Sequence, residues 1–277
     1  MYYTARSWLT WGMENSRFLE CLEADYRRIR EVVPGHLEER VPSCPDWSVD
    51  DLTRHVGLVY LHKTIAMREG AEPEQWPPDY ADDASALELM DDTYGQLVAE
   101  FAARDPAAAS GTWYGPDQTV GFWIRRMAQE TVIHRIDAEL GAGAPVAVVP
   151  SDLAVDGVDE LLRVFVEYSV DAWRDYFTEA LKDSPGHTYL ITADATADSP
   201  SVSWLVRTSP GQFNVTGGPG EQVSEAATPD VTLSGTPTQL LRWAWNRETP
   251  GEPAGLRVAG DAGALAEFRR CVVIATQ

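Results

Sequence analysis

Residues 120–137, VGFWIRRMAQETVIHRID, are predicted to form one helix, and the rest of the chain is interpreted around it. Every third or fourth residue falls on one stripe of that helix, which begins apolar and ends polar. The stripe consists of Val120, Trp123, Met127, Glu130, His134 and Asp137. Its apolar start indicates that this face points into a core. Burying a carboxylate or an imidazole unpaired costs on the order of several kcal/mol, so the stripe implies either an internal hydrogen-bond network or a metal ion.

Three further amphipathic helices are predicted upstream of this stretch. Their apolar residues repeat with helical spacing over residues 15–33, 48–68 and 87–101. Loops are predicted between them, over VPSCPDW (41–47) and the Pro- and acid-rich residues 72–83. Four such helices with one longer connection predict a four-helix bundle over residues 10–145.

A second domain is predicted over residues 146–277, after a run rich in Gly, Ala and Pro. It should begin with a long helix from about Asp152 to Leu181. Short β-prone runs follow, namely HTYLITAD, VSWLVRTS, QFNVTGG, DVTLSG and LRVAGD, and helical patterns appear in PTQLLRWAWNR and AGALAEFRRCVV. The second domain is therefore predicted to be an antiparallel sheet with helices on one face, which makes the whole chain α+β.

Composition and charge exclude several classes of partner. The chain has 277 residues and a formal net charge of −21, which argues against nucleic acid or an anionic membrane because phosphate would be repelled. No apolar run reaches the roughly 18 residues of a membrane span, and the N-terminus lacks a signal-peptide pattern. Three widely spaced cysteines form neither a disulfide framework nor a CxxC zinc site. The expected compartment is the reducing cytoplasm.

Three residues on two of the predicted helices form a candidate metal site. His55, Glu130 and His134 supply two imidazoles and one carboxylate, a set that suits a divalent first-row metal and leaves positions open for water or substrate. The chain has neither the HExxH motif of zincin proteases nor the ExxH pair of ferritin-like two-iron sites. The set suits zinc or ferrous iron, and ligand type alone does not separate the two.

Two nearby polar residues are open to more than one interpretation. His62 lies on the same stripe as His55 and is interpreted as a core histidine rather than as a group that supports a metal ligand. Asp137 is expected either to orient His134 or to pair with Arg135 or Arg54 on the surface.

Two pairs of sequence motifs carry a resemblance to a known family. VPSCPDWSVDDLTRHVG, followed further along by RRMAQETVIHRIDAE, resembles the N-terminal domain of the mycothiol-dependent maleylpyruvate isomerase family, whose bundle is DinB-like. DVTLSGTPTQLLRWAWNR and LRVAGD are similar to that family's C-terminal domain. The resemblance implies metal ligands at His55, Glu130 and His134, the residues that the stripe also selects. It further implies a catalytic arginine at Arg247, although Asn246 stands where glycine is usual.

The function that this resemblance implies is a metal-dependent enzyme, with zinc as the expected metal and mycothiol as the thiol cosubstrate. A metal lowers the pKa of a coordinated thiol or water and so supplies a nucleophile at neutral pH. The thiolate would act on an electrophilic small molecule, either as an isomerase, by addition, rotation and elimination, or as an S-transferase, by remaining attached. Arg247 would bind a carboxylate with its planar guanidinium. The alternative is a non-catalytic metal-binding protein that carries a small apolar ligand.

Overall fold

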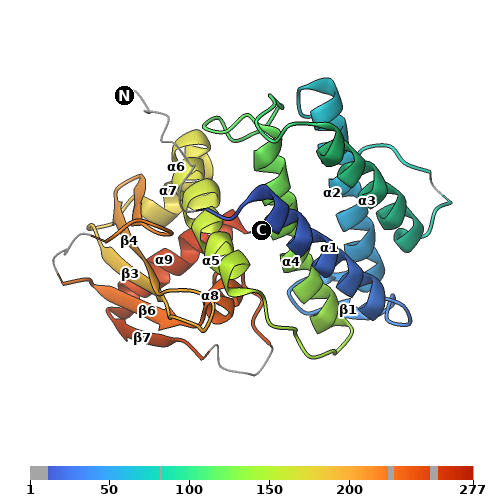
Figure 1. Cartoon of the computed structure of the whole chain (residues 1–277). Coiled ribbons are helices and arrows are strands. Elements are labelled where there is room, and N and C mark those ends of the chain that lie inside the picture. The colour runs from blue at the N-terminus through green and yellow to red at the C-terminus, as the bar shows by residue number, and fades with distance from the viewer. Residues whose placement is uncertain (1–11, 82, 224–227, 250–254, 277) are drawn as a thin grey trace. The chain divides into compact units, whose positions relative to one another are not determined.

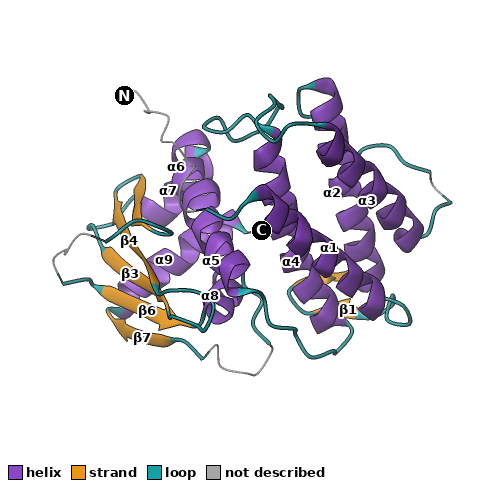
Figure 2. Cartoon of the chain, viewed as in Figure 1, coloured by secondary structure: helices purple, strands orange, loops and turns teal. Residues whose placement is uncertain are grey.

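The computed structural model describes residues 12–81, 83–223, 228–249 and 255–276. The chain divides into two compact units, one spanning Glu14–Ala147 and the other containing Val148–Gln277. The first unit is mainly helical and the second combines helices with a sheet (Figures 1 and 2), so the α+β class is confirmed. That residues 10–145 and 146–277 are separately folding domains stays a prediction. No helix in the described ranges has the length and apolar character needed to cross a membrane.

The helical unit contains four long helices. They are α1 (Asn15–Val32), α2 (Val49–Glu69), α3 (Ala86–Ala103) and α4 (Val120–Gly141). Helix α1 packs on α4, and α2 packs on both α3 and α4 (Figure 1). Helix α4 is buried on nearly all sides, with Arg126, Gln129 and Glu139 enclosed as fully as its apolar residues. Polar groups on α4 therefore need partners inside the unit, whichever face of the helix they occupy.

The start of α2 is fixed by a capping box. Ser48 Oγ accepts a hydrogen bond from the Asp51 backbone N–H at 3.1 Å, and Asp51 Oδ2 accepts one from the Ser48 N–H at 2.9 Å. The preceding segment is not the simple loop that was predicted. It forms a short antiparallel hairpin of β1 (Arg40–Val41) and β2 (Cys44–Ser48). These strands are too short to show a two-residue periodicity in sequence, which is why the pattern missed them.

A buried ion-pair network joins α1 to α4. Arg135 Nε donates to Asp25 Oδ1 at 2.9 Å, and Arg135 Nη1 donates to Glu139 Oε2 at 2.7 Å. The other oxygen of Glu139 accepts from Arg28 Nε at 2.8 Å. Removing one member would leave a buried charge uncompensated, so the network fixes how α4 packs against α1. It also engages Arg135 with residues other than Asp137.

The second unit begins with an interrupted helix rather than the single one predicted over 152–181. Its parts are α5 (Ser151–Glu160), the π-helical segment η1 (Leu161–Glu167), α6 (Tyr168–Ala172) and α7 (Arg174–Leu181). Trp173, with φ −129° and ψ 53°, lies outside the helical region and separates α6 from α7. Glu167 Oε1 accepts a hydrogen bond from the Val215 backbone N–H at 2.7 Å and so ties η1 to the sheet.

The sheet has five strands in the order β5-β4-β3-β6-β7. They are β3 (Thr188–Ala193), β4 (Val202–Ser209), β5 (Gln212–Gly217), β6 (Val231–Gly235) and β7 (Arg257–Gly260). All neighbouring strands are antiparallel except β3 and β6, which run parallel with Tyr189 opposite Val231. Each strand matches a predicted β-prone run; strand direction depends on the connections and cannot be read from periodicity. Helices α8 (Pro237–Ala244) and α9 (Ala262–Ala275) complete the unit, whose helices lie on one face of the sheet (Figure 2).

Candidate metal centre

The three sequence-predicted ligands lie together in the helical unit. His55 projects from α2, and Glu130 and His134 project from successive turns of α4. Glu130 Oε1 lies 3.1 Å from His134 Nε2 and 3.5 Å from His55 Nε2. One ligand atom from each residue lies within 4.8 Å of the other two, and no other such group of three occurs in the described ranges. Two imidazole nitrogens and one carboxylate oxygen at this spacing fit the donor set of a zinc site with an open position.

Asp137 supports His134 from the side opposite Glu130. Its Oδ2 lies 2.9 Å from His134 Nδ1, and its Oδ1 accepts a hydrogen bond from Ser43 Oγ in the β1–β2 hairpin. Asp137 is fully buried. Because a carboxylate accepts the proton of Nδ1, the Nε2 atom of His134 is the one left for a metal. Of the two sequence interpretations of Asp137, the structure shows the contact with His134.

Arg126 holds the other oxygen of Glu130. Its Nη2 donates to Glu130 Oε2 at 2.6 Å, one helical turn away on α4. Both side chains are largely enclosed, with exposed fractions of 4% and 19%. This ion pair leaves Glu130 Oε1 directed at the two histidines, so the carboxylate presents one oxygen to the site. Sequence reasoning missed Arg126, although its position four residues before Glu130 is the usual spacing of a helical ion pair.

The charges in this cluster shift the pKa values of its members in opposite directions. Burial alone would raise the pKa of Glu130. The pKa is nevertheless held well below its usual range by the charge and hydrogen bond of His134, together with the hydrogen bond of His55 and the charge of Arg126. Burial would lower the pKa of His134, but Glu130 and Asp137 together raise it to about 9. Without a metal, the site therefore holds a proton on His134 at neutral pH, and a bound cation would replace that proton.

Two tryptophans flank His55. The Trp47 ring, from β2, lies 4.7 Å from the His55 ring and 6.5 Å from that of His134, measured between centroids. The Trp76 ring, from the segment between α2 and α3, lies 5.8 Å from the His55 ring and 5.5 Å from that of His62. These indoles pack around His55, whose side chain is 24% exposed. Sequence patterns gave no signal for either one, because neither the short strand β2 nor the segment between α2 and α3 shows a periodicity.

His62 lies outside the group of three ligands. It is buried, and its Nδ1 makes no hydrogen bond within the described residues. Burial, aided by the charge of Lys63, lowers the pKa of His62. A neutral imidazole packed against Trp76 fits the interpretation of a core histidine.

Arg247 belongs to the other unit, at the end of α8. Asn246 has φ 58°, the left-handed conformation that glycine usually provides at this position. The Arg247 N–H donates to the Arg242 carbonyl at 2.7 Å and the Asn246 N–H to that of Trp243 at 3.2 Å, the hydrogen-bond pattern of a Schellman motif. Arg247 is buried, and its Nη1 donates to the Trp245 carbonyl at 2.7 Å. Asparagine at 246 thus preserves the turn that the usual glycine would make.

Comparisons with known proteins cover both units. Residues 19–139 match the mycothiol maleylpyruvate isomerase N-terminal domain, and residues 152–267 match the C-terminal domain of the same family. No curated protein sequence matches the chain. Two solved structures are similar in fold, the mycothiol-dependent maleylpyruvate isomerase (TM-score 0.54) and a histidine-to-alanine mutant of it (TM-score 0.56). Each is 12% identical and covers 90% of this chain and 95% of its own.

Proposed function

This chain belongs to the mycothiol-dependent maleylpyruvate isomerase family, and from that premise we propose that it is a zinc-dependent enzyme that uses mycothiol. Its second substrate would be an electrophilic small molecule. The observation that carries the proposal is the convergence of His55, Glu130 and His134, whose ligand atoms lie within 4.8 Å of one another. Three protein ligands leave an open coordination position, as catalytic zinc sites do.

The residues around these ligands are arranged to receive a metal. Asp137 holds the proton of His134 on Nδ1, which directs Nε2 toward Glu130. Arg126 neutralises one oxygen of Glu130 and fixes the rotamer that presents the other. Groups that orient a metal ligand in this way raise affinity by about 10- to 100-fold in other metal sites.

The chemistry expected of this centre is nucleophile activation. A zinc ion bound here would lower the pKa of a thiol or water at its open position. The chain's own residues would contribute in two ways. Trp47 would shield the two histidines from bulk water, and Arg247 would bind a carboxylate of the substrate or thiol through its planar guanidinium. Addition followed by elimination would give an isomerase, and addition without elimination an S-transferase.

The test is to offer the purified, zinc-loaded protein mycothiol together with a panel of electrophiles and to follow the products by mass spectrometry. An S-transferase would give a mycothiol adduct, and an isomerase would give a product of unchanged mass that forms only when the thiol is present. His134→Ala should abolish either product. Turnover that does not need a thiol would contradict the proposal. A protein that binds zinc but forms neither product with any electrophile would instead be the non-catalytic carrier.

A further inference from the structure

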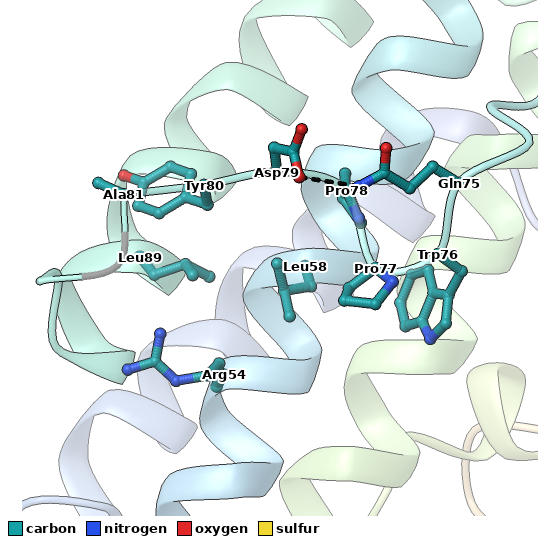
Figure 3. Close-up of a pocket in the computed structure, with 10 residues that line it drawn as sticks. All are labelled: Arg54, Leu58, Gln75, Trp76, Pro77, Pro78, Asp79, Tyr80, Ala81 and Leu89. Atoms are coloured by element: carbon teal, nitrogen blue, oxygen red, sulfur yellow. Dashed lines mark hydrogen bonds between the residues drawn. The ribbon is translucent and has the colours of Figure 1, made fainter.

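We propose that a pocket beside the metal centre binds a planar, apolar anion, of the kind represented by an aromatic carboxylate. The pocket lies between α2, α3 and the connecting residues 75–81 (Figure 3). Its role as the binding site for the electrophile rests on the proposed function. Its capacity to bind such an anion rests on its own geometry and can be tested without a metal.

The pocket has the size of a small-molecule site, and its lining combines apolar side chains with a larger share of polar surface. Its volume is about 350 Å³, at the lower end of the range of about 300–1,000 Å³ that such sites span. Leu58 enters from α2, Leu89 from α3, and Trp76, Pro77 and Tyr80 from the connecting segment. In Figure 3, Leu58 and Pro77 face each other across the space between the helix and that segment. Rigid aromatic and proline rings favour a flat apolar group.

Trp76 connects this pocket to the metal centre. Its indole is 52% exposed, although a large aromatic side chain is ordinarily well buried. The same ring lies 5.8 Å from that of His55, one of the proposed metal ligands. A flat group packed on the free surface of Trp76 would therefore sit next to His55. Burying this exposed indole would add favourable apolar contact to binding.

Arg54 supplies the positive charge of the pocket. Its Nη2 donates to the Ala84 carbonyl at 2.9 Å, which uses one of the five N–H groups of the guanidinium. Arg54 forms no ion pair within the described ranges. Two other cations of the helical unit do form ion pairs. Lys63 pairs with Glu72 at 2.8 Å, and Arg126 pairs with Glu130 at 2.6 Å. Together with hydrogen bonds from Ser48, the charge of Arg54 helps to lower the pKa of Asp51, one turn earlier on α2, but no described carboxylate lies within ion-pair distance of Arg54. The remaining N–H groups of this guanidinium at the wall of the pocket can therefore donate to an anionic ligand.

The one carboxylate on the pocket wall lies on the opposite side from Arg54. Asp79 Oδ1 accepts a hydrogen bond from Gln75 Nε2 at 2.8 Å, within the connecting segment (Figure 3). Arg54 projects from α2 below Leu58 and Leu89 in the same view, whereas Asp79 lies above them. An anion held by Arg54 would therefore have these two leucine side chains between it and Asp79. This separation favours one orientation, with the anionic end of the ligand at Arg54 and its apolar body toward Trp76.

The test compares two probes of the same shape, 2-naphthoate and its neutral analogue naphthalene-2-carboxamide. Binding is measured by calorimetry on metal-free protein. Wild-type protein should bind the carboxylate more tightly than the carboxamide, by about tenfold, the usual worth of a charge-assisted hydrogen bond. Arg54→Gln should abolish that preference, and Trp76→Ala should lower the affinity for both probes. The matched control is Arg207→Gln, an exposed arginine on β4, which should bind like wild type.

Each outcome bears on a distinct part of the account. The proposal that the pocket binds an aromatic carboxylate would be overturned if wild type did not bind naphthoate. It would also be overturned if wild type and both pocket variants bound naphthoate equally well. Zinc affinity is measured separately with a chromophoric chelator, on wild type and Arg54→Gln. Naphthoate binding without zinc binding would overturn the proposed function and, with it, the role of the pocket in that reaction. Zinc binding without naphthoate binding would overturn the anion-binding role of the pocket and leave the proposed function standing.

Discussion

Asp137 lies directly behind His134, with its Oδ2 2.9 Å from Nδ1 of the imidazole. The aspartate is fully buried and is itself held by Ser43 from the β1–β2 hairpin. This arrangement fixes both the tautomer and the orientation of His134, since a carboxylate can only accept the Nδ1 proton. A short hairpin that looks like a loop in sequence thus contributes to the geometry of the candidate metal centre.

Replacing Asp137 should weaken metal binding. In Asp137→Asn the side-chain volume is kept but the negative charge is lost, and the amide can turn its NH₂ group toward Nδ1. We expect zinc affinity to fall by about 10- to 100-fold, measured by competition with a chromophoric chelator. Asp46→Asn, an exposed position in the same hairpin, is the matched control and should bind zinc like wild type. Equal affinities for the two variants would show that Asp137 does not support the site.

The metal-free protein should lose stability in alkaline solution because of His134. Its folded pKa of about 9 lies above the ordinary value of 6.5, so its contribution is fully present below pH 6.5 and is lost as pH rises through 9. Glu130, whose pKa is lowered, contributes above its ordinary value of 4.5 and loses that contribution as pH falls through its folded pKa. The contributions of His134 and Glu130 to stability are therefore both fully present between about pH 4.5 and 6.5.

The measurement is the free energy of unfolding in urea at pH 6 and pH 10, for chelator-treated wild type and His134→Gln. Between pH 6 and pH 10 the free energy of unfolding should fall further for wild type than for the variant, by at most about 3 kcal/mol. Zinc should reverse this dependence, because a metal competes with protons for His134 and binds more tightly as pH rises. Parallel pH dependence of the metal-free wild type and the variant would contradict the charge arrangement.

The left-handed turn at Asn246 should tolerate glycine but not alanine. Alanine pays a steric cost at φ 58°, whereas glycine does not. Asn246→Ala should therefore lower the free energy of unfolding by about 1 kcal/mol, and Asn246→Gly should stay within a few tenths of wild type. Urea unfolding of the three proteins compares them directly. If alanine were as stable as asparagine, the Schellman turn would not be what holds the end of α8.

Arg247 should serve the reaction more than it serves folding. Lysine can still donate to the Trp245 carbonyl, which Arg247 contacts at 2.7 Å, but it cannot make a two-pronged contact with a carboxylate. For Arg247→Lys we expect kcat/KM to fall by about tenfold or more, with zinc content and Tm unchanged. A fully active variant would leave Arg247 as a residue that only caps α8.

Much of this structure was predictable because it depends on local periodicity. Each β-prone run marks a strand, and each helical run except that over 152–181 marks one helix. The stripe on α4 selected Glu130 and His134 together. The features missed depend on residues from distant parts of the chain or on irregular backbone. Trp47 and Trp76 reach His55 from segments without periodicity, and Trp173 breaks a helix through its backbone angles rather than through any proline or glycine.

The partner of a buried polar residue was equally hard to predict. Asp137 had His134, Arg135 and Arg54 as candidate partners in sequence, and only the fold distinguishes them. Arg135 faces Asp25 and Glu139, and Arg54 faces the Ala84 carbonyl, so His134 is the candidate that Asp137 contacts.

The most direct test of the account is the zinc content of purified protein in which single ligands are removed. Elemental analysis should find about one zinc per chain in wild type, as a three-ligand catalytic site predicts. His55→Ala and His134→Ala should each lose most of it, while His36→Ala, outside the cluster, should retain it. Full zinc occupancy in both ligand variants would contradict the assignment of His55, Glu130 and His134 as the metal centre.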